Sequence, residues 1–242
     1  PTRRSSDLTT TTGGAPRVLS WLEEWHQCEW PEKKVYFTSV TEQWAVIALN
    51  GPNARKVLEK VVEGIDLSEE AFPFMTWRDC KVAGVKTRIF RISFTGALSF
   101  ELNIPPSYAL QVWRALMDAG EEFNITPYGT EAMHVLRAEK GYIIVGQETD
   151  GTVTPYDLGM GWIVGKAKKD FIGKRGLARE GLVAPGRKQL VGLLTIEPEI
   201  VLEEGAQVVP SADVVVSSSP HPGAQASATP KIQRHDFIAP SS

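Results

Sequence analysis

One acidic residue in an extended segment is the strongest candidate for chemistry in this sequence. The segment Ser99–Ile104 alternates apolar and polar residues, so a strand would place Glu101 and Asn103 on the face opposite its apolar side chains. A carboxylate in mid-strand is either solvated or paired, because an unpaired buried charge is very costly. If Glu101 instead faces a ligand, its two oxygens can accept two adjacent N–H donors, such as those of a pterin ring.

A second candidate is the basic residue in the segment Leu136–Gly141, which reads Leu-Arg-Ala-Glu-Lys-Gly. Arg137 would lie near the end of a helix that Thr130 caps and Gly141 closes. There it could interact favourably with the helix C-terminus, pair with a nearby acid, or anchor the carboxylate of a ligand. The residue pattern alone leaves both the structural and the ligand-binding interpretations open for Arg137 and for Glu101.

Other familiar catalytic arrangements are missing from the sequence. The four histidines and two cysteines are too scattered for a metal site, and no Ser-His-Asp set has a recognisable spacing. The pair Gly159 and Gly161 lacks the preceding strand and the third glycine of a phosphate-binding loop. Cys80 could be reactive only if it is exposed. We therefore expect neither a metal centre nor a nucleotide-binding loop.

The composition is that of an ordinary globular protein. Hydrophobic residues make up 42% and charged residues 23% of the 242 residues. The net charge of −3 lacks the basic excess of a nucleic-acid-binding protein. No apolar run approaches the ~18 residues that span a bilayer, and no charged-then-apolar leader is present. Two cysteines cannot make a disulfide framework. We expect a reduced, cytoplasmic protein that binds neither nucleic acid nor membrane.

Helix and strand signals alternate along the middle of the chain and would position these candidates. Apolar spacing predicts helices over 18–25 and 54–61. Cap residues and closing glycines predict helices over 107–119, from the N-cap Ser107 to Gly120, and over 130–140, from Thr130 to Gly141. Runs rich in β-branched residues predict strands over 35–40, 44–49, 80–83, 85–93 and 99–104. Strands joined by hairpins and covered by helices indicate the α+β class, with antiparallel sheets under helices.

The domain organisation follows from changes in texture along the chain. Residues 1–8 have no periodicity and read like a translated sequencing adapter, which suggests a scar. Residues 9–170 form the predicted α+β domain. Residues 171–209, with a strand over 188–194, are interpreted as the start of a truncated all-β unit, a small barrel domain. Residues 210–242 are rich in Ser, Pro, Ala and Val, so they are either a disordered tail or a frameshifted sequence.

Four stretches between about residues 9 and 209 carry a family resemblance. They read TTTTGGAPRVLSWLEEWHQCEWPEKKVYFTSVTEQWAVIALNGPNARKVL, RISFTGALSFELNIP, YGTEAMHVLRAEKGYIIVGQETDGTVTPYDLGMGW and RKQLVGLLT. This part of the chain resembles the folate-binding, aminomethyltransferase-like region of the alpha subunits of heterotetrameric sarcosine oxidases. Shorter pieces, such as the aromatic-Thr-Gly turn and LRxExG, occur across the wider glycine-cleavage T-protein family, which includes dimethylglycine oxidase.

The resemblance implies a function in one-carbon metabolism. In such enzymes a flavin in another subunit oxidises the N-methyl group of sarcosine to an imine, which leaves glycine as the demethylated product. The one-carbon unit then passes to tetrahydrofolate as 5,10-methylenetetrahydrofolate, or water releases it as formaldehyde. Oxygen takes up the electrons and becomes hydrogen peroxide. The implied partners are the beta, gamma and delta subunits, and FMN, FAD and NAD are expected in the full complex outside this segment.

The resemblance also assigns residues to the implied folate site. Glu101 matches the carboxylate that grips the pterin, while Phe94 and Thr95 belong to the aromatic-Thr-Gly turn, where many relatives have Tyr in place of Phe94. The ring can still stack against folate, but a hydroxyl contact is lost. Arg137 matches the LRxExG arginine. Met133 stands where the T-protein has a folate-contacting arginine, so that contact is absent.

The catalytic aspartate implied by the family would lie upstream of Thr9, where this chain has only residues 1–8. We therefore expect the chain by itself to turn over folate weakly or not at all. Three other functions stay open: a glycine-cleavage-type aminomethyltransferase, a non-enzymatic folate-binding protein of the iron–sulphur assembly kind, and an interaction domain with a vestigial pocket. The Met133 position disfavours the first, and the missing cysteine after Gly141 disfavours the second.

Overall fold

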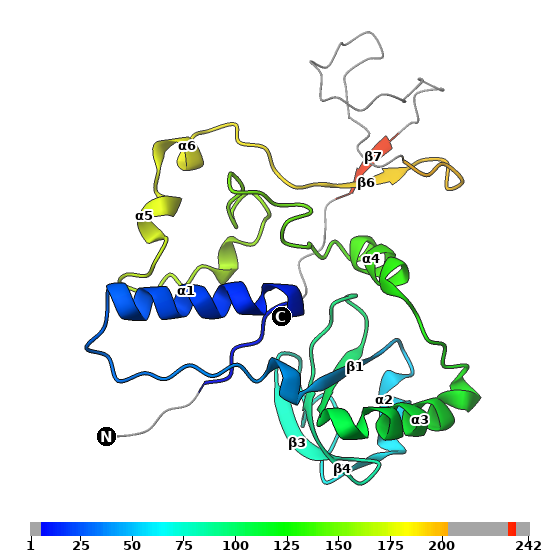
Figure 1. Cartoon of the computed structure of the whole chain (residues 1–242). Helices are drawn as coiled ribbons and strands as arrows, with labels where there is room; N and C mark the ends of the chain where they lie inside the picture. Colours follow the sequence, from blue (N-terminus) through cyan, green and yellow to red (C-terminus); the bar gives the residue numbers. More distant parts are fainter. Residues whose placement is uncertain (1–5, 203–231, 236–242) are drawn as a thin grey trace, which may run out of the picture. The chain divides into compact units, whose positions relative to one another are not determined.

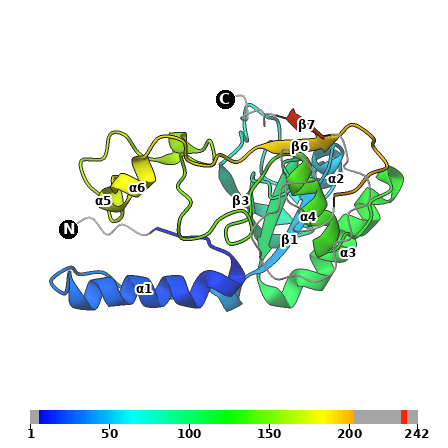
Figure 2. The same ribbon diagram turned by 90° about the horizontal axis from the view of Figure 1, so that it is seen from above.

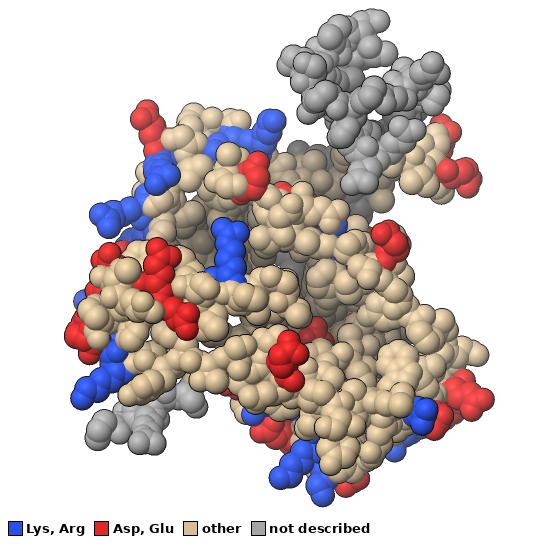
Figure 3. Space-filling model, viewed as in Figure 1, with Lys and Arg blue, Asp and Glu red and all other residues tan. Residues whose placement is uncertain are grey.

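The computed structural model describes residues 6–202 and 232–235, and the chain divides into two compact units, 1–138 and 139–242 (Figure 1). Among the described residues, no helix is both long and apolar enough to cross a membrane. Lysine and arginine side chains are interspersed with aspartate and glutamate on the face shown in Figure 3. Neither sign of charge therefore forms a broad patch on that face.

An antiparallel sheet of five strands forms the centre of the first unit, in the order β1-β5-β4-β3-β2. The strands are β1 (Ala45–Asn50), β2 (Val62–Glu63), β3 (Trp77–Val82), β4 (Val85–Phe90) and β5 (Ser99–Ile104). A tight turn at Gly84, with φ +77°, joins β3 to β4 as the predicted hairpin. The sheet confirms the predicted class of an antiparallel sheet covered by helices.

The hydrophobic core lies on one face of this sheet. Helices α2 (Ala54–Glu59) and α3 (Ala109–Gly120) lie side by side on that face (Figures 1 and 2). The three apolar side chains of β5 are completely buried beneath them, as the alternation predicted: Phe100, Leu102 and Ile104. Burying each such side chain stabilises the fold by roughly 1.5–3 kcal/mol, which fixes the register of β5 and the face that Glu101 occupies.

Two further helices of the first unit were predicted in outline. Helix α1 (Ala15–Cys28) begins with Pro16 in its first turn and carries an edge-to-face pair, Trp21 and Trp25, with ring centroids 6.1 Å apart. Helix α4 (Thr130–Glu139) ends just before Gly141, whose φ is +73°. Short 3-10 turns lie at η1 (Thr12–Gly14), η2 (Thr41–Gln43), η3 (Pro106–Tyr108) and η4 (Glu121–Phe123).

Three local predictions in this unit were wrong. Residues 35–40 form no strand, because a β-rich run becomes a strand only when a neighbour pairs with it. Ser107 does not cap α3: it lies inside η3, and Tyr108 occupies the N-cap without a side-chain hydrogen bond. Strand β4 ends at Phe90 rather than Ser93, since residues 91–93 leave the sheet before the turn at Thr95.

The second unit contains short elements joined by long connections. These are η5 (Gly161–Ile163), α5 (Lys174–Leu177), α6 (Glu180–Val183), β6 (Gly192–Thr195) and β7 (Ile232–His235), with β6 and β7 paired antiparallel. Strand β6 overlaps the predicted strand over 188–194. The fuller prediction of a truncated all-β unit over 171–209 stays a prediction, since residues 203–209 lie outside the described part. Of the predicted scar and tail, the structure describes only residues 6–8 and 232–235.

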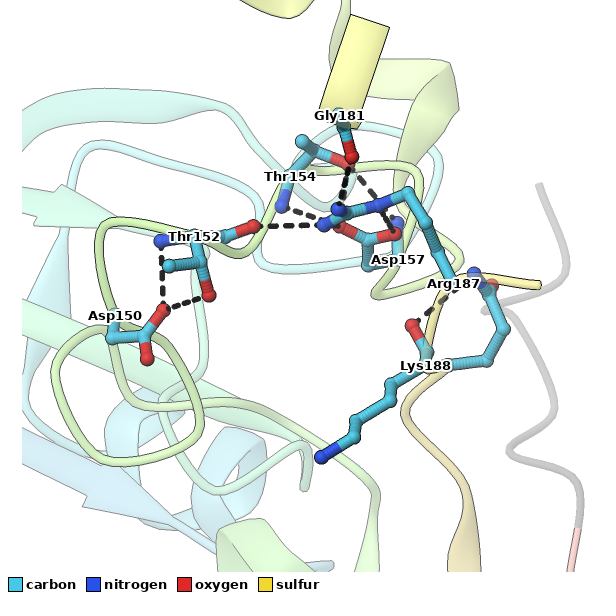
Figure 4. A network of polar contacts seen from close by, with 8 residues as sticks. Asp150, Thr152, Thr154, Asp157, Gly181, Arg187 and Lys188 are labelled. Carbon is cyan, nitrogen blue, oxygen red and sulfur yellow. Dashed lines mark hydrogen bonds and ion pairs between the residues drawn. The ribbon is translucent and has the colours of Figure 1, made fainter. Parts of the chain in front are cut away.

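A partly buried ion pair ties two distant segments of this second unit together (Figure 4). Arg187 donates from Nε to Oδ1 of Asp157 over 2.8 Å and from Nη2 to Oδ2 over 2.5 Å. The same guanidinium reaches the backbone carbonyls of Thr152 and Gly181 at 2.7 and 2.9 Å. The hydrogen bonds from Arg187 and from Thr154 hold the pKa of the Asp157 carboxyl well below its ordinary value. Because every polar atom of this carboxylate is engaged by the protein, the pair fastens the loop between residues 157 and 187.

Candidate functional site

The face of the sheet opposite the core carries Asn50 of β1, Arg88 of β4, and Glu101 and Asn103 of β5. In antiparallel register, Glu101 of β5 lies between Ala48 of β1 and Phe90 of β4, and Asn50 is opposite Ser99. Residues directly opposite each other share a face, and a diagonal neighbour lies roughly 7–8 Å away. Glu101 and Asn50 are such diagonal neighbours, so the sheet brings their side chains together on the open face.

Glu101 is half-buried on this face, and no partner in the described part of the chain bonds to its carboxylate. Loss of solvation by burial raises the pKa of the Glu101 carboxyl above its ordinary value. The two carboxylate oxygens of Glu101 can therefore still accept hydrogen bonds, at a position that is partly shielded from water. Glu101 is thus partly exposed and has no protein partner among the described residues, and both the structural and the ligand-binding interpretations stay open.

A short chain of side-chain hydrogen bonds lies beside Glu101. The Thr95 hydroxyl donates to Oδ1 of Asn50 over 3.4 Å, and Nδ2 of Asn50 makes a short hydrogen bond to the Tyr128 hydroxyl. Thr95 is buried, with 2% of its surface exposed, while the preceding Phe94 is 38% exposed. Because Gly51 N–H also donates to the Leu98 carbonyl over 2.8 Å, the turn that carries Phe94 and Thr95 is fixed to the end of β1.

The other residues singled out in the sequence lie elsewhere in the first unit. Arg137 lies on α4 and is buried, with 6% of its surface exposed, a position that requires the guanidinium to be held by polar groups. Met133 is half-buried on the same helix. Cys80 faces the core side of β3, and burial, aided by the charge of Asp79, raises the pKa of its thiol to about 11. Cys80 is therefore a packed side chain and not a reactive thiol at neutral pH.

Sequence reasoning missed Asn50 and Tyr128. Both lie inside the stretches that carry the family resemblance, and Tyr128 comes just before the helix predicted from residue 130. Their chemistry depends on each other, however, and 78 residues of chain separate them. No local pattern could have paired them.

The arrangement can bind a flat polar molecule by one edge. A carboxylate accepts two N–H groups that lie side by side, and a phenol hydroxyl beside it can donate to a neighbouring oxygen. The exposed Phe94 ring offers an apolar surface close to the turn at Thr95. None of these side chains is an activated nucleophile. What they can contribute is recognition and orientation of a ligand.

The raised pKa of Glu101 has a consequence for stability that can be measured. The native state holds this proton to a higher pH than the unfolded chain does, so the ionised carboxylate opposes folding at neutral pH. We expect Glu101→Gln to be at least as stable as the parent at pH 7, with the difference shrinking as the pH falls through 4 and below the ordinary pKa of a glutamate, where the carboxyl of the parent becomes mostly protonated in both states. Urea unfolding at the two pH values measures this; a variant that is less stable at pH 7 by the same amount as at pH 4 would contradict it.

Comparison with known proteins places this site in a family context. Residues 3–168 match the family model for the GCVT N-terminal domain. A sarcosine oxidase subunit alpha from Corynebacterium sp. (strain U-96) is 56% identical over 214 residues, which cover 88% of this chain and 22% of that protein. The corresponding subunit from Rhizobium meliloti is 42% identical over 84% of this chain and 20% of that protein.

A shorter relative shows that the resemblance extends beyond oxidase subunits. An aminomethyltransferase from Halothermothrix orenii is 38% identical over 155 residues, covering 63% of this chain and 42% of that protein. The chain thus spans about a fifth of the length of the sarcosine oxidase alpha subunits it matches, and under half of the aminomethyltransferase.

Proposed function

The chain belongs to the GCVT N-terminal domain family, and we propose that it is the folate-binding region of a sarcosine oxidase alpha subunit. The activity proposed for the whole enzyme is oxidative demethylation of sarcosine to glycine. The one-carbon unit passes to tetrahydrofolate or is released as formaldehyde, and hydrogen peroxide forms. The identity of 56% to one such subunit, against 38% to an aminomethyltransferase, supports this proposal over the alternative of a glycine-cleavage enzyme.

The single observation that carries the folate proposal is the half-buried, unpartnered carboxylate of Glu101. Desolvation of a carboxylate costs free energy, and two charge-assisted hydrogen bonds from a ligand would return it. The 2-amino group and the adjacent ring N–H of a pterin present such a pair of donors, so the residues fit the group. Tetrahydrofolate, when bound, supplies the nitrogen atoms that take up the one-carbon unit.

The neighbouring residues would hold the molecule in place. The exposed Phe94 ring would stack on the folate, and Thr95 would fix the turn through its bond to Asn50. Arg137, buried on α4, would act by fixing the helix or by anchoring a ligand carboxylate. In this proposal the residues bind and orient folate, and the groups that move protons during transfer are supplied by the rest of the enzyme.

Redox chemistry would belong to other parts of the proposed complex. We assign FMN, FAD and NAD to those parts because the glycine pair at Gly159 and Gly161 does not form a dinucleotide-binding fingerprint. The partners proposed are the beta, gamma and delta subunits of the oxidase.

Calorimetry with tetrahydrofolate tests the proposal. Titration of the full chain under anaerobic conditions is expected to give saturable heat with one molecule bound per chain, since one pterin edge fills one carboxylate. The control ligand is p-aminobenzoylglutamate, which lacks the pterin and is expected to bind far more weakly. A well-folded chain that gives no saturable heat with tetrahydrofolate, or equal binding of both ligands, would contradict a pterin site at Glu101.

A further inference from the structure

The hydroxyl of Tyr128 is a polar group on the open face that the resemblance to known proteins did not assign. Tyr128 comes from the connection between η4 and α4, and the residue is 40% exposed. Its hydroxyl is joined by a short hydrogen bond to the amide of Asn50, at the end of β1. Because Asn50 is the diagonal neighbour of Glu101 on the adjacent strand, this bond brings the hydroxyl to the same side of the sheet as the carboxylate.

The hydrogen bonds beside it fix the direction in which Tyr128 can act. The backbone N–H of Ala97 donates to Oγ1 of Thr95 over 3.4 Å, which leaves the Thr95 proton to be donated to Oδ1 of Asn50, also over 3.4 Å. The carbonyl end of the Asn50 amide is thereby turned toward Thr95, and its NH2 end faces Tyr128. The phenol oxygen is then the acceptor, so its own proton remains to be donated to something else.

That proton stays in place at neutral pH. Burial raises the pKa of the Tyr128 phenol, and the negative charge of Glu101 raises it further, while the hydrogen bond from Asn50 lowers it. No described residue accepts the Tyr128 proton. The open face thus presents a carboxylate that only accepts, next to a hydroxyl that is set to donate.

We propose that Tyr128 donates a hydrogen bond to the carbonyl oxygen at position 4 of the pterin, and so makes this site selective for 4-oxo over 4-amino pterins. The inference rests on the proposed function, because it takes the ligand of Glu101 to be a pterin. On a 4-oxo pterin the carbonyl oxygen lies next to the two N–H groups that donate to Glu101. The same edge of the ring can therefore donate to the Glu101 carboxylate and accept from the Tyr128 hydroxyl. A 4-amino group at that place presents hydrogens to the Tyr128 proton, and the ring nitrogen beside it carries no hydrogen for Glu101, so the share of the preference that belongs to Tyr128 is the part that Tyr128→Phe removes. Tyr128 is therefore a specificity-determining residue, and Asn50 and Thr95 are positioning residues that act through it.

The test compares two ligands on two proteins by calorimetry. Tetrahydrofolate and its 4-amino-4-deoxy counterpart, tetrahydroaminopterin, are titrated into the full chain and into Tyr128→Phe. We expect the parent to prefer tetrahydrofolate, and the phenylalanine variant to lose about 3- to 10-fold of that preference, the value of one neutral hydrogen bond. The ratio of the two affinities removes effects on folding or on the pocket as a whole, because such effects change both ligands together.

The matched control is Tyr108→Phe, which removes the hydroxyl of another exposed tyrosine, in η3 (49% exposed against 40% for Tyr128), and is expected to leave the preference unchanged. An unchanged preference in Tyr128→Phe, while Glu101→Gln still loses tetrahydrofolate binding, would overturn the role of Tyr128 and leave the proposed function standing. A parent chain that binds neither ligand would overturn both proposals. An equal loss of preference in Tyr128→Phe and Tyr108→Phe would also overturn the role of Tyr128, because the loss would then not depend on the hydroxyl beside Asn50.

Discussion

Glu101→Gln is expected to weaken the binding of tetrahydrofolate by roughly 100-fold. The substitution replaces one carboxylate oxygen with an NH2 group, which then faces a ligand N–H instead of accepting it. One charge-assisted hydrogen bond is lost and the other becomes neutral, which together cost about 3 kcal/mol, and each 1.4 kcal/mol is a factor of ten in affinity. The protein fold is expected to tolerate the change, because the carboxylate of Glu101 forms no hydrogen bond with any other described residue.

Calorimetry of the variant against the parent measures this loss, and two variants serve as controls. Asn103→Ala changes the next polar residue on the same face of β5, and Glu70→Gln removes an exposed carboxylate elsewhere in the first unit. Both are expected to bind tetrahydrofolate within about threefold of the parent, since neither side chain is assigned a contact with the ligand and such surface substitutions change free energies by about 0.5 kcal/mol. A Glu101→Gln variant that binds as well as these controls would remove the carboxylate from the site.

The pH dependence of binding should separate the ionised carboxylate from a merely nearby charge. The pKa of Glu101 is raised by burial, so its protonation begins at a higher pH than that of an ordinary glutamate. Only the ionised form accepts two N–H groups, and the affinity of the parent should therefore fall as the pH drops toward this raised pKa. The affinity of Glu101→Gln is expected to lack this fall, because the variant has no carboxylate to protonate at that position.

Phe100→Ala is expected to lower the free energy of unfolding of the first unit by about 3–5 kcal/mol. The ring is completely buried, and its centroid lies 6.0 Å from that of Phe72. The guanidinium of Arg91 also lies over the Phe100 ring, 5.2 Å from its centroid. Removing the ring leaves a cavity between the sheet and its helices, and the packed neighbours can collapse into it only in part. A loss of this size is a large fraction of the total stability of a typical domain.

Urea unfolding followed by hydrogen exchange of peptides from 77–104 measures this loss in the first unit alone. The control is Phe94→Ala, the same chemical change at a ring that is 38% exposed, which is expected to cost no more than about 1 kcal/mol. If the full alanine variant does not fold, Phe100→Leu should show a smaller loss in the same direction. Equal losses at the two phenylalanines would contradict the assignment of the core to the Phe100 face of β5.

Together the two predictions concern adjacent residues on opposite faces of one strand. Phe100 should govern stability with little direct effect on ligand contacts, and Glu101 should govern binding with little or even a favourable effect on stability. This division follows from the period of two along a strand, which sends neighbouring side chains to opposite faces.

The sequence by itself determined the parts of this protein that depend on short-range patterns. Apolar alternation placed Glu101 on the face away from the core, and helical spacing located α1 and α2. Closing glycines marked the ends of α3 and α4, and Gly84 marked the hairpin between β3 and β4. These predictions succeed because burial of a repeating apolar face is itself the main stabilising term, and that repeat is written in consecutive residues.

Only the tertiary structure decided which residues meet. The β-rich run 35–40 has the composition of a strand, yet no strand in the described part of the chain pairs with it. The bonds that join Thr95, Asn50 and Tyr128 connect residues 45 and 78 positions apart, and the pair of Asp157 and Arg187 spans 30 positions. A hydrogen bond forms only when the donor and the acceptor lie within a few tenths of an ångström of the right distance. For residues far apart in the sequence, that distance is set by the whole fold and not by any local pattern.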